Sequence, residues 1–138
     1  MHLKTLGLAE HNSDEWRVDL HVEFVAEYEA LPEAVQDELL ALTINLREKG
    51  PLLGRPLVDT LNGSRHANMK ELRFRAGGGV WRIAFAFDPE RKAVLLVAGN
   101  KAGISQRRFY RDLIAVADRR FDRHLQTLRM QGRTSKWQ

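Results

Sequence analysis

The sequence predicts an α+β fold in which an N-terminal helical hairpin packs on a small, mostly antiparallel sheet. Three observations predict it: two helical segments between residues 24 and 50, two strands joined by a glycine turn over residues 70–88, and a long amphipathic stretch over residues 107–129. The expected order is β-α-α-β-β-β-α. A length of 138 residues suits one domain, residues 1–138, with its own hydrophobic core. We expect residues 1–14 to be a loose lead-in and about 129–138 a flexible tail.

The N-terminal part of the chain is expected to supply one strand and the helical hairpin. Residues 16–21 alternate apolar and polar side chains, as a half-buried strand does. Apolar residues recur at helical spacing over residues 24–31, and again at intervals of three or four over residues 35–46. Pro32 suits the start of the second helix, and Gly50 followed by proline suits its end.

The stretch "KELRFRAGGGVWRIAFAFD", residues 70–88, predicts a β-hairpin with two unlike faces. One row of alternating residues is apolar and is expected to lie under the helical hairpin. We expect the short alanines of the other row to leave that face hollow, as a shallow groove whose arginines suit a phosphodiester backbone. In the alternative, these arginines form salt bridges, although Glu71 is the one nearby acid in that row. The row contains Arg73, Arg75, Arg82, Ala84 and Ala86.

The rest of the chain completes the sheet and its cover. Residues 52–69 are rich in turn formers and predict a long loop or short irregular elements. The stretch "KAVLLVAGN", residues 92–100, has apolar residues on both faces, which predicts a central strand. Residues 107–129 carry an apolar stripe at helical spacing and predict a long amphipathic helix.

Charge is divided unevenly along the sequence. Residues 1–50 hold 4 Lys/Arg and 11 Asp/Glu, a net charge of −7, whereas residues 51–138 hold 18 and 7, a net charge of +11. Such a basic half favours binding to a polyanion, most commonly the phosphates of a nucleic acid. The alternative is that these charges only solvate the surface, but scattered charges would suit that better.

Composition excludes several classes of function. The chain has no cysteine, which excludes disulfides, thiol catalysis and zinc–thiolate sites. No apolar run approaches the roughly 18 residues of a membrane span, and the N-terminus lacks a secretory signal. We therefore expect a cytoplasmic protein. Walker, GxGxxG and HExxH motifs are also missing, and no cofactor or metal is expected.

Four short motifs resemble a known family. They are the loop "GSRHANMKELR", the strand "WRIAF", the strand end "AGNK" and the following "FY". Together they resemble toxins of bacterial type II toxin–antitoxin modules in the RelE/HigB superfamily, from about Trp16 to Leu128. The resemblance implies a RelE-like fold and cleavage of mRNA, usually on the translating ribosome. It also implies inhibition by a small antitoxin, commonly a helix-turn-helix protein encoded beside the toxin.

The resemblance also implies roles for particular residues. Arg82 matches the strand arginine that contacts the scissile phosphate in RelE-like toxins, and Lys101 matches a basic residue that stabilises the transition state. Tyr110 matches a C-terminal tyrosine placed near the reacting phosphate. Arg73 and Arg75 stand where those toxins carry strand lysines or arginines.

These residue types suffice for metal-independent RNA cleavage. The ribose 2′-OH can attack its own phosphate, so the protein must only move protons and neutralise the added charge. Arg82 and Lys101 can neutralise that charge. Further arginines are expected to bind RNA phosphates. These are Arg65, Arg75, Arg107, Arg108 and Arg111.

Several residues are candidates for the acid or base. A lysine crowded by arginines has its charged form disfavoured, so Lys70 or Lys101 can serve. His66 precedes the arginine-bearing strand and titrates near neutrality, although a lone loop histidine is more often structural. His21 could approach the same groove from the first strand, whereas His124 looks incidental.

Two other functions compete with the nuclease. A ParE-like toxin binds and poisons DNA gyrase without cutting nucleic acid, and an inactive relative would bind RNA only. Arg82, Lys101 and Tyr110 together favour the nuclease, because a gyrase inhibitor has no need of that combination.

Overall fold

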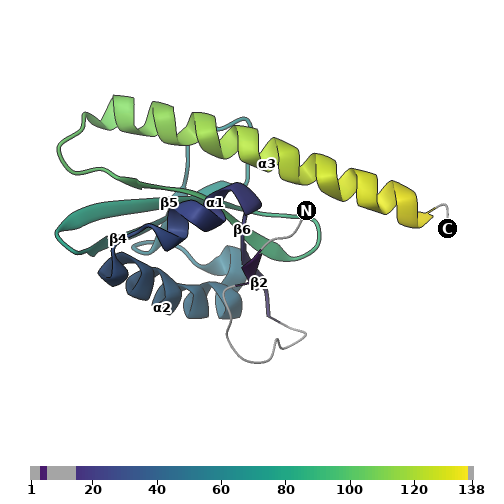
Figure 1. Ribbon diagram of the computed structural model, residues 1–138, viewed down its shortest axis with the longest axis horizontal. Coiled ribbons are helices and arrows are strands. Elements are labelled where there is room, and N and C mark those ends of the chain that lie inside the picture. Colours follow the sequence, from purple (N-terminus) through teal and green to yellow (C-terminus); the bar gives the residue numbers. More distant parts are fainter. Residues whose placement is uncertain (1–3, 6–14, 137–138) are drawn as a thin grey trace.

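The computed structural model describes residues 4–5 and 15–136 of the chain. It has three layers: helices α1 and α2 lie on one face of a six-stranded sheet, and helix α3 lies on the other (Figure 1). The predicted α+β class and element order are confirmed, with the short strands β1 and β3 added. The elements are β1 (Lys4–Thr5), β2 (Arg17–Leu20), α1 (Val22–Glu29), α2 (Glu33–Lys49), β3 (Val58–Thr60), β4 (Met69–Ala76), β5 (Gly79–Phe87), β6 (Lys92–Asn100) and α3 (Gln106–Lys136).

The sheet has the strand order β1-β2-β6-β5-β4-β3. All described pairs are antiparallel except β2 with β6, which is parallel. Strand β6 is therefore interior, as its two apolar faces predicted. Gly77 and Gly78 join β4 to β5 with φ angles of 55° and 79°, and glycine adopts such left-handed conformations without a Cβ penalty. The turn sets Arg73 directly opposite Arg82.

The first core lies between the sheet and the helical hairpin. Phe24 of α1 and Leu39 of α2 pack with Ile83 and Phe85 of β5, and all four are fully buried. This confirms the apolar row of the predicted hairpin. The chain leaves α2 at Gly50, which has a φ of +52°; an added Cβ would lie 2.4 Å from the Trp16 ring. Only glycine satisfies both the backbone conformation and that close approach.

The second core corrects the prediction of a hollow groove. Ala84 and Ala86 are fully buried under α3, where they pack with Phe109 and Phe121. Gly99 completes the contact, since an added Cβ would lie 2.7 Å from the Phe109 ring. Small residues on this face therefore form the surface on which the C-terminal helix packs, because they let its aromatic side chains reach the sheet.

Helix α3 continues to Lys136, beyond the Arg129 end predicted for it, so residues 129–136 of the predicted tail are helical, and residues 137–138 lie outside the described part. Its C-terminal part extends past the sheet (Figure 1). Of the predicted lead-in, Lys4–Thr5 pair with β2, and the other residues up to 14 lie outside the described part. Within the described residues, no helix combines the length and apolar character needed to cross a bilayer.

Candidate functional site

Strand β5 and the first turns of α3 bring Arg82 and Tyr110 together. Arg82 Nε donates a hydrogen bond to the Tyr110 hydroxyl at 3.2 Å, and Nη1 donates to the Trp81 carbonyl at 2.9 Å. Arg82 is only 6% exposed. Its Nη2 has no hydrogen bond to the part of the chain that the structure describes, which leaves that nitrogen available for a ligand.

Glu71 of β4 is the carboxylate that pairs with the arginines of this site. Its Oε2 accepts a hydrogen bond from Arg73 Nη1 at 3.0 Å, and its Oε1 lies 3.7 Å from Arg82 Nε. Glu71 is 4% exposed, and Oε1 is buried without a hydrogen-bond partner. The salt-bridge alternative is thus confirmed for Arg73 and Arg82, since one carboxylate serves both.

Lys101, directly after β6, completes what we call the Tyr110 cluster, formed by Glu71, Arg73, Arg82, Lys101 and Tyr110. Lys101 Nζ lies 5.9 Å from the centre of the Tyr110 ring, within the range of a cation–π contact. Partial burial, and then the charges of Arg82 and Arg73, lower the pKa of Lys101. Burial raises the pKa of Tyr110, so its hydroxyl keeps its proton at neutral pH.

A pocket of about 590 Å³ adjoins the cluster and is called the Tyr110 pocket. Its volume lies within the usual range for small-molecule sites. Part of its wall comes from residues 59–62, which are the end of β3 and the turn after it. The lining residues that carry charge or a hydroxyl are Arg55, Asp59, Thr60, Glu71, Arg73, Arg107 and Tyr110.

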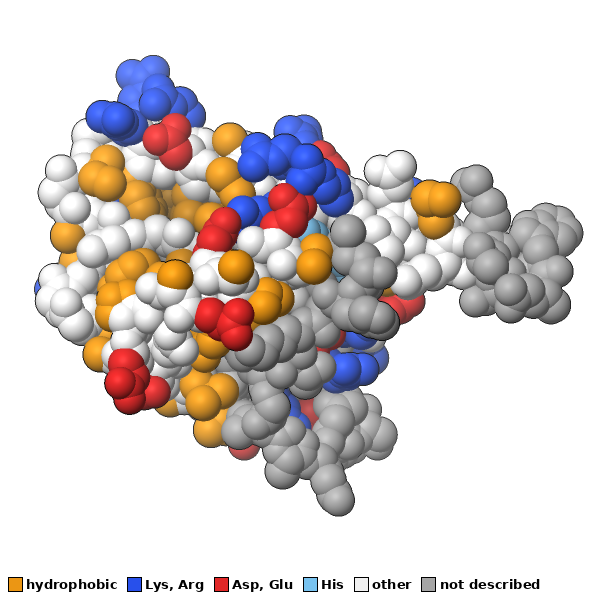
Figure 2. Space-filling view, viewed as in Figure 1, with side chains coloured by type: hydrophobic (Ala, Val, Ile, Leu, Met, Phe, Trp, Pro, Cys, Tyr) orange, Lys and Arg blue, Asp and Glu red, His pale blue; other side chains and the backbone are white. Residues whose placement is uncertain are grey.

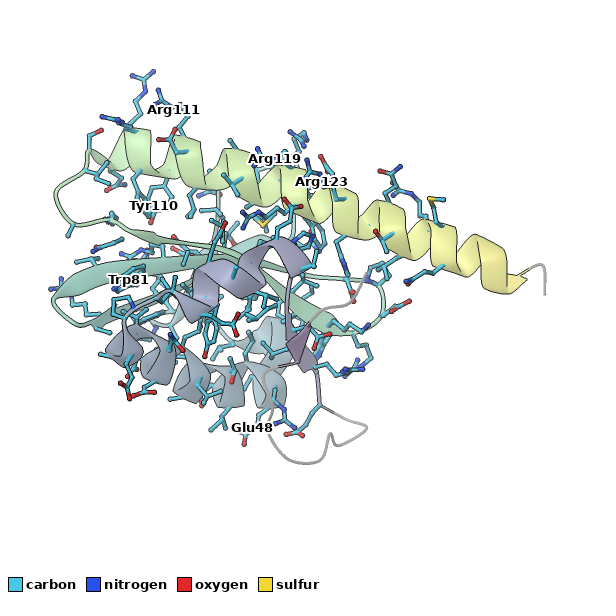
Figure 3. All side chains as sticks on the ribbon, viewed as in Figure 1. Glu48, Trp81, Tyr110, Arg111, Arg119 and Arg123 are labelled. Atoms are coloured by element: carbon cyan, nitrogen blue, oxygen red, sulfur yellow. The ribbon has the colours of Figure 1, made fainter. Side chains whose placement is uncertain are left out.

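Exposed arginines surround this end of the molecule. Arg107 and Arg108 are exposed in the first turn of α3, and Arg75 is exposed near the end of β4. In the described residues, none of these three has an ion pair. Arg111 pairs with its neighbour Asp112 at 3.2 Å. Figure 2 shows the basic group over the start of α3, and Figure 3 shows Arg111 directed outward while Tyr110 lies on the sheet side of the helix.

Three predicted site residues lie away from the cluster. His66 Nε2 bonds to Asp122 at 2.7 Å, and Asp122 lies about 18 Å along the helix axis from Tyr110 at the α-helical rise. Arg65 pairs with the same Asp122. Lys70 alternates with Glu71 along β4 and so lies on the opposite sheet face, where its Nζ donates to Thr60 Oγ1 at 3.3 Å.

The structure also corrects the expectations for two histidines. His21 is buried at the start of α1, where its Nδ1 accepts a hydrogen bond from the Glu23 backbone at 3.1 Å; it does not approach the cluster. Burial lowers its pKa to about 4. His124 is not incidental, since its Nε2 lies 2.8 Å from Asp88 Oδ2 and both are buried. On the polar side of β2, Asp19 and His21 are buried and only Arg17 is exposed, so the strand is more buried than the half-buried strand predicted.

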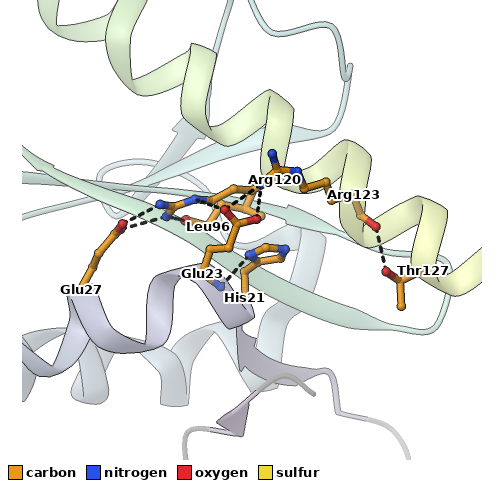
Figure 4. Close-up of polar contacts among 7 residues, drawn as sticks. All are labelled: His21, Glu23, Glu27, Leu96, Arg120, Arg123 and Thr127. Carbon is orange, nitrogen blue, oxygen red and sulfur yellow. Dashed lines mark hydrogen bonds and ion pairs between the residues drawn. The ribbon is translucent and has the colours of Figure 1, made fainter. Parts of the chain in front are cut away.

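Another buried arginine, Arg120, joins the layers at the middle of α3 (Figure 4). It donates to Glu27 of α1 at 2.9 Å and to the Leu96 carbonyl at 2.7 Å. Leu96 has no β5 partner because the β5–β6 register shifts between Ala84 and Phe85, which makes it the extra residue of a β-bulge. Arg120 thus has a structural role.

The described residues contain no group of three or more histidine, aspartate or glutamate side chains arranged to hold a metal ion. What this part of the chain provides instead is the Tyr110 cluster, with three cations, one carboxylate and a protonated phenol. Such groups can bind a phosphate and stabilise added negative charge on it.

Comparison with known proteins places the chain in a family. Residues 26–122, which contain the whole Tyr110 cluster, match the model of the phage-derived Gp49-like proteins (DUF891). The chain belongs to the Gp49-like family. No solved structure matches this Gp49-like chain significantly.

Two curated proteins of Mycobacterium tuberculosis are similar to this Gp49-like chain. One, named "Putative toxin HigB2", is 56% identical over 81 residues, which are 58% of this chain and 40% of the relative. The other, named "Putative toxin HigB3", is 51% identical over 80 residues, which are 58% of this chain and 68% of the relative. The match thus spans less than half of the first relative. These names confirm the predicted resemblance to HigB-type proteins.

Proposed function

We propose that this chain is the toxin of a toxin–antitoxin module and acts as a metal-independent mRNA endoribonuclease. The observation that carries this proposal is the Tyr110 cluster, in which Arg73, Arg82 and Lys101 converge around Glu71 and Tyr110. Arg73, Glu71 and Tyr110 also line a pocket of about 590 Å³. Glu71 cancels one of the three positive charges. The remaining two match the two negative charges of a phosphorane formed when a 2′-oxygen attacks an RNA phosphodiester.

The proposed reaction uses the substrate's own 2′-OH as nucleophile. The 2′-oxygen forms a bond to phosphorus, the bond from phosphorus to the 5′-oxygen breaks, and the products are a 2′,3′-cyclic phosphate and a 5′-hydroxyl. Arg82 Nη2 and Arg73 bind the non-bridging oxygens, and the Tyr110 hydroxyl donates a hydrogen bond to them. Lys101, whose lowered pKa eases loss of its proton, protonates the leaving 5′-oxygen, and the 2′-OH proton passes to solvent.

The surroundings of the cluster suit an RNA held on the ribosome. Arg75, Arg107 and Arg108 are exposed and lack ion pairs in the described residues, so their charges are available to phosphates of mRNA or rRNA. Two similar proteins are named as toxins of the HigB type. A cognate antitoxin, commonly a helix-turn-helix protein encoded alongside, would be the inhibitory partner.

Mapping mRNA 5′ ends after brief induction of the chain in bacteria tests this function. We expect growth arrest, relief by a co-expressed antitoxin, and new 5′ ends within codons by primer extension. DNA damage with intact mRNA would instead identify a gyrase poison. Harmless accumulation of folded protein would contradict a toxin of either kind.

A further inference from the structure

Strand β6 has a free edge along its second half. Strand β2 pairs with β6 only from Lys92 to Leu95, whereas β6 continues to Asn100 with β5 on its other side. Within the described residues, no strand covers the β2 side of residues 97–100. The burial changes at the same point, because residues 93–96 are fully buried and residues 97–99 are half-buried.

A groove runs along this free edge and is called the β6 groove. It has a volume of about 570 Å³. Its floor is formed by the small residues Val97, Ala98 and Gly99, and its walls include Ile104 and Phe109 from the start of α3 and the loop before it. Figure 2 shows hydrophobic side chains just below the basic group at the start of α3, on the same face.

The rim of the β6 groove is basic. Arg108 lines it, is exposed and has no ion pair within the described residues. Asp112, the acid in the lining, is paired with Arg111 at 3.2 Å. A ligand here therefore meets the unpaired guanidinium group of Arg108 beside an apolar floor, which favours an acidic side chain at the rim and short apolar ones below.

We propose that the β6 groove binds an extended acidic peptide segment of a protein partner, which adds to the sheet as a strand beside residues 97–100. A free strand edge presents alternating N–H and C=O groups at the spacing of another polypeptide, and strand addition is a common mode of peptide recognition. A nucleic acid lacks that alternation. The β6 groove therefore favours a peptide over RNA.

The β6 groove is separate from the Tyr110 pocket. Ser105, Arg108 and Phe109 line the groove, whereas Gln106, Arg107 and Tyr110 line the pocket, so the two sites lie on different sides of the same helical turns. Peptide binding at β6 does not depend on the proposed nuclease chemistry, and the two can fail independently.

Fluorescence anisotropy with a labelled peptide that alternates glutamate and valine tests the proposal. We expect saturable binding that Ile104→Asp weakens about tenfold, because the new carboxylate repels the peptide at the groove wall. Ile44→Asp is the matched control: both isoleucines are 46% exposed, and Ile44 lies on α2. We expect no loss of binding with Ile44→Asp and unchanged RNA cleavage with Ile104→Asp.

Hydrogen exchange locates the bound peptide. The same peptide should slow exchange of the amides of residues 97–100, and a peptide alternating lysine and valine should not. Failure of the acidic peptide to bind, equal weakening by both aspartate variants, or protection confined to β3 and β4 would overturn the proposal. So would protection of residues 97–100 by self-association before any peptide is added.

Discussion

At the scale of single residues, burial decides what Arg82 and its neighbours can do. Arg82 and Glu71 are each less than a tenth exposed, and an arginine and a carboxylate buried this far depend on each other's charge. Arg73 shares the same carboxylate from a more exposed position. The cluster is thus fixed before substrate arrives, which is the condition under which charged groups stabilise a transition state most effectively.

Replacing one hydroxyl at this scale separates chemistry from packing. Tyr110→Phe removes the hydroxyl that accepts the hydrogen bond from Arg82 Nε. We expect RNA cleavage to fall about 10-fold to 100-fold while the melting temperature changes little. Tyr28→Phe is the matched control, since Tyr28 is buried at 8% exposure in the other core. Equal cleavage by both variants would remove Tyr110 from the mechanism.

Strand alternation was enough to predict which arginines share a face, and it also contained information that the site prediction did not use. Lys70 stands one residue from Glu71 and two from Leu72, so the same alternation already places it on the apolar side of β4. His66 is different. Its pairing with Asp122 joins residues far apart in sequence, and no local pattern specifies that contact.

At the scale of elements, α3 explains the composition of the sheet face beneath it. The apolar stripe of α3 predicted a buried helix, but a stripe does not specify which surface buries it. The sequence therefore predicts a groove at the alanines of β5, whereas in the structure they form the surface that α3 covers. The apolar stripe of α3 and the alanines of β5 can both be recognised in the sequence, but the packing of the helix on that strand cannot.

A larger side chain on the sheet surface beneath α3 should destabilise the protein. Ala84 is fully buried in the second core, and Ala84→Leu should lower the free energy of unfolding by about 1–3 kcal/mol through overpacking. Ala115→Leu, on the exposed side of α3, should change it by less than about 0.5 kcal/mol. Urea denaturation of both variants measures the difference, and equal stability would contradict the packing of α3 on β5.

Helix α1 should respond to acid through His21. The pKa of this buried histidine is lowered from 6.5 to about 4. Between these pH values, His21 binds a proton in the unfolded chain but not in the folded chain. Its contribution to stability is complete above pH 6.5 and is lost as the pH falls toward about 4. Urea melts across this range should show a smaller loss for His21→Asn, which keeps a capping acceptor. An equal loss in both proteins would contradict this role of His21.

At the scale of the whole molecule, the uneven charge of the sequence divides into paired and unpaired groups. Part of the basic C-terminal half is used internally: Arg120 and Arg123 of α3 bind Glu27 and Glu23 of the acidic half. What remains unpaired among the described residues includes Arg107, which lines the Tyr110 pocket, and Arg108, which lines the β6 groove at the same end of α3. The net charge alone indicated a polyanion partner, whereas the structure indicates which end of the molecule would meet it.

Affinity for RNA or ribosomes should therefore fall steeply with added salt. Arg107→Gln should reduce the slope of log affinity against log salt by about 1, as expected for one lost phosphate contact. Arg123→Gln should leave the slope unchanged, because Arg123 is already paired with Glu23 at 2.6 Å. Binding indifferent to ionic strength, or equal slopes for both variants, would contradict an RNA-facing surface at the start of α3.

The most direct test of the proposed nuclease is RNA cleavage by two variants at equally buried arginines. Arg82 and Arg120 are 6% and 7% exposed, and each is paired with a glutamate. Lysine keeps the charge at both positions but loses the forked geometry that binds phosphate. We predict that Arg82→Lys cleaves mRNA about 100-fold more slowly than wild type while remaining folded, and that Arg120→Lys cleaves at the wild-type rate with a lowered melting temperature. Full cleavage by folded Arg82→Lys would show that the Tyr110 cluster is not the active site.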